Sequence, residues 1–204
     1  LSMFFTSCKT GQKTTSSRTG DPNSLAMSPE YRQLHETFMD ALIAKTQGNS
    51  EKALALFQTC LNQDPRNAAA MYELAQLYAG KDLRSEALRM AENATKLEPA
   101  NSWYLYLHAQ LLQTYNRFSE AIPVFEKLQK LNPDKSEFTL QAADNYVMAG
   151  KLNEALKAYD RVEKKMGIQE AVSLQKQKIY MHLGKQQEAI KELEKLIAQF
   201  PAES

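Results

Sequence analysis

Four side chains suited to molecular recognition recur at helical spacing near the middle of the chain. Trp103, Tyr106, Gln110 and Gln113 stand at positions i, i+3, i+7 and i+10, which places them on one stripe of a helix. Aromatic rings supply contact area, and amides can bond a peptide backbone. The stripe therefore predicts a surface for an extended or helical peptide. The competing interpretation is that the rings pack on adjacent helices and bind nothing.

Tyr72 and Tyr106 hold equivalent positions when one part of the sequence is aligned with the next, so the same alignment extends the stripe to further residues. The equivalent positions add further rings, an amide and one carboxylate, so neighbouring helices are expected to contribute to the same surface. The complete predicted binding surface comprises His35, Phe38, Tyr72, Gln76, Trp103, Tyr106, Gln110, Gln113, Leu140 and Asp144.

Residues for catalysis or metal binding form no recognisable pattern. His35, His108 and His182 lie far apart without the paired spacing of metal ligands. No serine or cysteine has a local base signature, and no glycine-rich phosphate loop occurs. We therefore expect no enzymatic activity, no cofactor and no metal. The 25 basic and 24 acidic residues nearly cancel, which argues against nucleic acid as a partner and against electrostatic attraction to a membrane.

The first residues suggest a lipid anchor. The run Phe5, Thr6, Ser7 and Cys8 places small residues between an apolar side chain and a cysteine. This resembles the lipobox of bacterial lipoproteins, so residues 1–8 are interpreted as the end of a signal segment with lipid attached at Cys8. The alternative is a disordered leader with an incidental cysteine. Residues 9–28 are rich in Thr, Ser, Lys and Gly and are expected to form a flexible linker.

The elements that position these residues follow a strict internal repeat. Alanines recur at one constant spacing, about 34 residues, and so do helix breakers, apart from one place where glycine replaces proline. Such a period is the signature of a stacked helical array. The alanines are Ala53, Ala87, Ala121, Ala155 and Ala189, and the breakers are Pro65, Pro99, Pro133, Gly167 and Pro201.

Each unit is expected to contain two helices. In the unit 68–101, apolar residues follow the spacing of one helix face, a break follows at Gly80, and a second apolar stripe runs to Leu97. Ser85 is predicted to cap the second helix, and Pro99 to end it. The predicted units are 29–67, 68–101, 102–135, 136–169 and 170–201, followed by a tail of residues 202–204.

These residues give the chain its resemblance to the tetratricopeptide repeat family. A small residue fills the middle of the first helix in four units, and Gln177 replaces it in the fifth. Large residues follow in the second helix, and Ala91 replaces the large residue in the second unit. The resemblance implies an all-α, right-handed superhelix of five antiparallel helix pairs, with a concave groove lined by the first helices. The small residues are Ala41, Ala75, Ala109 and Ala143, and the large ones Phe57, Phe125, Tyr159 and Leu193.

The expected function is a non-catalytic scaffold that binds a protein or peptide in this groove. With the Cys8 anchor, the chain looks like the tetratricopeptide lipoproteins of bacteria, tethered in the periplasm and serving outer-membrane assembly or secretion. Lys9 after the cysteine favours the outer membrane. The alternative is the adaptor portion of a longer enzyme or sensor. The identity of the partner and the oligomeric state stay open.

Overall fold

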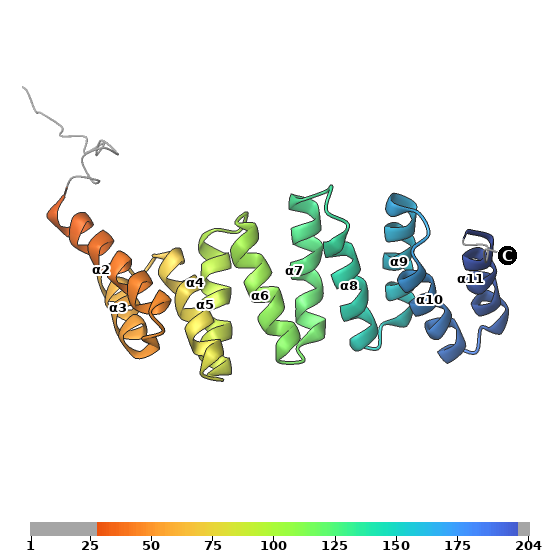
Figure 1. Ribbon diagram of the computed structural model, residues 1–204, viewed down its shortest axis with the longest axis horizontal. Helices are drawn as coiled ribbons and strands as arrows, with labels where there is room; N and C mark the ends of the chain where they lie inside the picture. The colour runs from red at the N-terminus through yellow and green to blue at the C-terminus, as the bar shows by residue number, and fades with distance from the viewer. Residues whose placement is uncertain (1–27, 200–204) are drawn as a thin grey trace, which may run out of the picture.

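The computed structural model of the protein describes residues 28–199. Within this range the chain forms ten α-helices and no strand, and the helices follow one another in a single extended row (Figure 1). The helices are α2 (Pro29–Thr46), α3 (Ser50–Gln63), α4 (Ala68–Gly80), α5 (Arg84–Leu97), α6 (Ser102–Thr114), α7 (Phe118–Leu131), α8 (Glu137–Met148), α9 (Leu152–Met166), α10 (Glu170–His182) and α11 (Gln186–Gln199).

Each helix packs chiefly on the helices before and after it in the chain. The row therefore consists of five antiparallel pairs, and the predicted all-α fold is confirmed. In each pair the even-numbered helix comes first and is called the first helix here. The predicted anchor at Cys8, the linker up to residue 27 and the tail 202–204 lie outside the described residues.

Buried alanines let the helices of a pair approach closely. The alanines predicted in the first helices of four units are completely buried, and those in the second helices are at most 1% exposed. A short side chain at these positions allows helix axes to approach to about 8–10 Å. The alanines are Ala41, Ala75, Ala109 and Ala143 in the first helices, and Ala53, Ala87, Ala121, Ala155 and Ala189 in the second.

The turn within each pair uses one residue in the left-handed backbone region. These residues follow the same repeat as the buried alanines, with φ between 56° and 77°. They are Gly48, Asp82, Asn116, Gly150 and Gly184. Glycine adopts this conformation freely, and Asn and Asp tolerate it better than other residues. The turn thus survives in the second and third pairs without glycine.

The predicted cap at Ser85 is wrong. Helix α5 begins at Arg84, and no side chain caps its N-terminus. The left-handed residue Asp82 directs the chain into the helix earlier than expected, so that the amide of Ala87 already bonds the carbonyl of Leu83 at 2.9 Å. Side-chain caps occur at the start of α2, α3, α4 and α6, for example at α4, where Asn67 accepts a hydrogen bond from the amide of Ala70 at 2.9 Å.

Candidate functional site

Side chains of successive first helices touch one another and form a continuous surface, called the groove here. Lys45 of α2 donates a hydrogen bond to Gln76 of α4 at 3.1 Å. Further along, Gln113 of α6 donates to Gln141 of α8 at 3.1 Å. These bonds join first helices one unit apart, so side chains of α2 contact those of α4, and side chains of α6 contact those of α8.

Trp103 and Tyr106 are the most prominent residues of the groove. The side chain of Trp103 is 74% exposed and that of Tyr106 is 37% exposed. Trp103 lies in the first turn of α6, which begins after Asn101, whose side chain accepts a hydrogen bond from the Trp103 amide at 3.1 Å. The cap therefore fixes the backbone from which the indole projects.

These two rings line a cleft of about 370 Å³, called the central cleft here. Its other wall comes from the next unit, where Phe138 of α8 meets Tyr106 edge to face with ring centroids 6.1 Å apart. The ammonium of Lys135 lies 5.8 Å from the centre of the Phe138 ring, and Glu137 adds a carboxylate. The central cleft thus offers the rings of Trp103 and Tyr106, one cation and one anion to a ligand, while the nearly buried Phe138 forms part of its wall.

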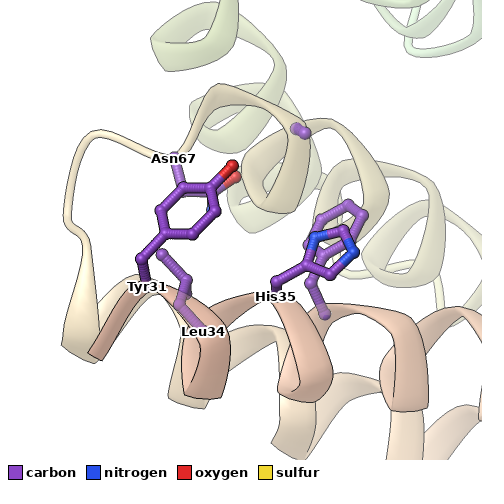
Figure 2. Close-up of a pocket in the computed structure, with 6 residues that line it drawn as sticks. Tyr31, Leu34, His35 and Asn67 are labelled. Atoms are coloured by element: carbon purple, nitrogen blue, oxygen red, sulfur yellow. The ribbon is translucent and has the colours of Figure 1, made fainter. Parts of the chain in front are cut away.

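A smaller cleft of about 160 Å³ occupies the equivalent place in the first unit, two repeats earlier in the chain. His35 and Phe38 line it and correspond to Trp103 and Tyr106. Figure 2 shows Tyr31 and His35 rising from the same helix, with the Tyr31 ring next to Asn67. His35 and Phe38 in the first unit and Trp103 and Tyr106 in the third therefore line two clefts at equivalent places in the repeat.

Between these clefts, the predicted residues of the second unit pack on the protein itself. The Tyr72 ring lies 5.2 Å from the ring of Tyr104 on α6, centroid to centroid. Burial raises the pKa of both phenols. Gln76 accepts the hydrogen bond from Lys45 described above. Tyr72 and Gln76 therefore contribute more to the contact between neighbouring units than to an open cleft.

The fourth unit contributes Leu140 and Asp144. Leu140 is half-buried against the apolar cluster of the last two pairs. Asp144 accepts a hydrogen bond from the hydroxyl of Tyr159 at 2.6 Å, and its burial raises the pKa of the carboxyl. The carboxylate is thus engaged with α9, the second helix of its own pair. Gln110 of α6 is exposed and available to a ligand.

The sequence analysis missed two contributors to the groove and one buried ion cluster. Phe138 and Lys135 belong to the α7–α8 connection and the start of α8, outside the stripe on which the prediction relied. Lys176, with only 1% of its side chain exposed, lies directly before Gln177, which had been assigned to the small-residue position. The signal was available, because Lys176 stands one repeat after Ala142, a buried position.

In residues 28–199, no group of three or more His, Cys, Asp or Glu side chains could hold a metal ion. Cys60 is buried, and burial raises the pKa of its thiol, which disfavours the reactive thiolate. None of the helices in the described range is long and apolar enough to cross a membrane.

Comparison with solved structures identifies the same architecture. The crystal structure of YrrB, described as a TPR protein with an unusual peptide-binding site, matches with a TM-score of 0.66 at 21% identity, over 86% of this chain and 94% of that one. A crystal structure of MamA matches with a TM-score of 0.66 at 16% identity, over 84% and 97% of the two chains. MamA from Desulfovibrio magneticus RS-1 matches with a TM-score of 0.62 at 14% identity, over 85% of this chain and 96% of that one.

At these identities the likeness establishes the fold alone. No curated protein matches the chain. Two descriptions of the tetratricopeptide repeat do match, one over residues 44–111 and 112–177 and the other over residues 171–202. These matches cover most of the sequence and agree with the constant spacing of its buried alanines. The chain therefore belongs to the tetratricopeptide repeat family.

Proposed function

We propose that the chain is a non-catalytic scaffold that binds a peptide segment of another protein in the groove, centred on the central cleft. The observation that carries this proposal is the 74% exposure of Trp103 beside Tyr106 and Phe138. A large ring left in water beside other rings loses the hydrophobic stabilisation that burial would supply. A partner that covers Trp103 would recover this free energy.

The composition of the cleft favours a peptide over a purely apolar ligand. Gln110 lies exposed one turn beyond Tyr106, and Lys135 and Glu137 stand at the mouth. An amide and two opposite charges can bond the backbone and polar side chains of a peptide, while the rings hold an apolar residue. YrrB, which has the same fold, is described as having a peptide-binding site, which agrees with this proposal.

Replacing both Trp103 and Tyr106 by Ala should weaken binding of a selected peptide by about 2 kcal/mol or more, because exposed aromatic residues at an interface centre carry much of its energy. A peptide selected from a displayed library provides the ligand, and calorimetric titration measures its affinity. Since Trp103 is the only tryptophan, its fluorescence in the unmodified protein reports directly whether the peptide covers the ring.

The matched control replaces Met166 and Ile197 by Ala, which removes two side chains that are 53% and 71% exposed on second helices. Binding should be unchanged in this variant. Equal affinity of the aromatic variant and the unmodified protein, or a tryptophan spectrum that does not respond to the peptide, would exclude the central cleft as the site.

We further propose that Cys8 carries a lipid that tethers the scaffold to a bacterial membrane, facing the periplasm. The support is the lipobox-like run before Cys8 and the polar stretch that separates it from α2. Expressed behind a complete signal peptide in a Gram-negative host, the chain should sediment with the outer membrane, and Cys8→Ser should release it. Equal partitioning of the two forms would remove the anchor from the proposal.

A further inference from the structure

A larger cleft of about 500 Å³, called the outer cleft here, lies between the second helices α7 and α9. Lys130 lines it from α7, Arg161 and Lys165 line it from α9, and Ala142 of α8 contributes to its wall. The residues of α8 that contact α6 in the groove, Phe138 and Gln141, are different ones. The outer cleft is therefore separate from the central cleft.

The outer cleft has a small residue, Ala142, at a position that holds larger side chains in the second, third and fifth units. Ala142 corresponds to Leu74 two units earlier and to Lys176 one unit later, and both of those side chains are buried. The ammonium of Lys176 bonds carboxylates of α9 and α11 at this place in the last interface. Ala142 places no such long side chain in the corresponding region between α7 and α9.

One carboxylate oxygen of Glu126 and the amide oxygen of Gln129 in the outer cleft accept hydrogen bonds from the protein, whereas two of the cleft's cations have no ion-pair partner in the described residues. Glu126 accepts a hydrogen bond from the hydroxyl of Tyr146 at 2.9 Å, and Gln129 accepts one from the hydroxyl of Thr139 at 2.7 Å. Within residues 28–199, neither Lys130 nor Arg161 forms an ion pair. With Lys165 included, the outer cleft is lined by three cations and one carboxylate, that of Glu126.

A similar cleft of about 380 Å³ lies one unit earlier, between α5 and α7. Lys96 and Lys127 flank it, at the positions that Lys130 and Arg161 hold in the next unit. Lys96 is paired with Glu92 at 2.6 Å, while Lys127 forms no ion pair in the described part of the chain. Apolar side chains, including Val124, line its wall. Cations thus recur at a fixed spacing along two consecutive clefts.

We propose that these two clefts form a second binding surface that takes an acidic, extended polypeptide segment. A single small anion would need one cluster of cations, whereas cations repeated from one unit to the next match carboxylates repeated along a chain. Free cations exposed at a cleft mouth attract such a segment and bond its carboxylates directly. The surface is independent of the groove, so this partner need not be the one held at Trp103.

The test measures fluorescence anisotropy of a labelled peptide of Glu and Ser residues on the full chain. A peptide with Gln in place of Glu should not bind, and added salt should weaken binding of the acidic peptide. Replacing Lys130 and Arg161 together by Gln should lower its affinity about ten-fold or more, because bonds between charged groups are the strong ones. The matched control, Arg32→Gln with Lys178→Gln, removes the same charge from exposed positions on first helices and should have little effect.

A second variant tests whether the peptide enters the cleft. Ala142→Leu leaves the charge unchanged and places leucine where the second unit has the buried Leu74, so the fold should tolerate it. We expect weaker binding of the acidic peptide by this variant, and unchanged binding by Trp103→Ala. Retained affinity in the Lys130 and Arg161 variant, or an equal loss in the control, would overturn the proposal. Displacement of the peptide by an equal concentration of phosphate or citrate would identify a free small anion as the ligand and would overturn it too.

Discussion

Lys176→Ala should lower the free energy of unfolding of the last helix pairs by about 3–5 kcal/mol. The lysine is 1% exposed, and its ammonium lies 2.7 Å from carboxylate oxygens of Asp160 and Glu163 and 3.1 Å from Glu192. Burial alone lowers the pKa of Lys176, but hydrogen bonds to the three carboxylates outweigh it and raise the pKa above its usual value. The lysine is therefore charged at neutral pH. Its removal takes from Glu163, which is 12% exposed, its only cation in the described residues, and it leaves the buried Glu192 with Lys195 alone, 2.9 Å away.

A triple variant separates the loss of the cation from the loss of side-chain volume. Changing Lys176 and Glu192 to Ala and Glu163 to Gln copies the residues found one repeat earlier, namely Ala142, Ala158 and Gln129. This variant removes the buried charges together, and replacing a whole buried ion cluster often costs little. One oxygen of Glu192, Oε2, is buried without a hydrogen-bond partner in the described structure, which makes the native cluster itself expensive. The triple variant should therefore be distinctly more stable than Lys176→Ala.

Urea denaturation followed by circular dichroism compares the variants, and hydrogen exchange locates the effect. Each helix packs mainly on its neighbours, so loosening the last interface should increase exchange in α10 and α11 and leave α4 to α7 protected. Equal stability of Lys176→Ala and the unmodified protein would show that the buried cation does not compensate its neighbours.

The repeat was predictable because packing dictates it directly. A position such as Ala109, which lies between two close helices, tolerates only a small side chain, and this requirement recurs in the first four units. The start of α5 was not predictable from the same pattern, since it depends on the backbone of Asp82 at φ 56°. Lys176 was missed because a long charged residue in a buried position contradicts the pattern, and only the carboxylates of α9 and α11 make it acceptable.

The binding surface was predictable only in part. Helical spacing placed Trp103 and Tyr106 on one face of α6, because that relation is local. The contribution of Phe138 depends on how the next pair stacks, which spacing within one helix does not encode. The same holds for Asp144, whose carboxylate is engaged by Tyr159 on a different helix. Gln110 and Asp144 hold equivalent positions in successive units, yet only Gln110 is exposed to a ligand.

Ala121→Glu should destabilise the protein by about 3 kcal/mol or more. The effect should extend to more helices than the effect of a change at Lys176. Ala121 is completely buried on α7, the second helix of the central pair, where it holds the same position as Ala87 and Ala155. A glutamate there would have to displace the packed helices and would bury a carboxylate. The lysines of α7, Lys127 and Lys130, line the clefts on either side of this helix, and Arg117, one turn before Ala121, is already paired with Glu120 at 2.6 Å.

The central location of α7 makes this variant a test of how far the pairs depend on one another. In an array that is stabilised by contacts between neighbours, disrupting the middle helix removes support from both halves, whereas disrupting the end affects one side. We therefore expect a lower melting temperature with increased hydrogen exchange in both α5 and α9. The control is Ser119→Glu, an exposed change in the first turn of the same helix, where an acidic side chain is compatible with the helix dipole and stability should hold. If Ala121→Glu melts like the control, the close approach of α6 and α7 at Ala121 is not what stabilises the array.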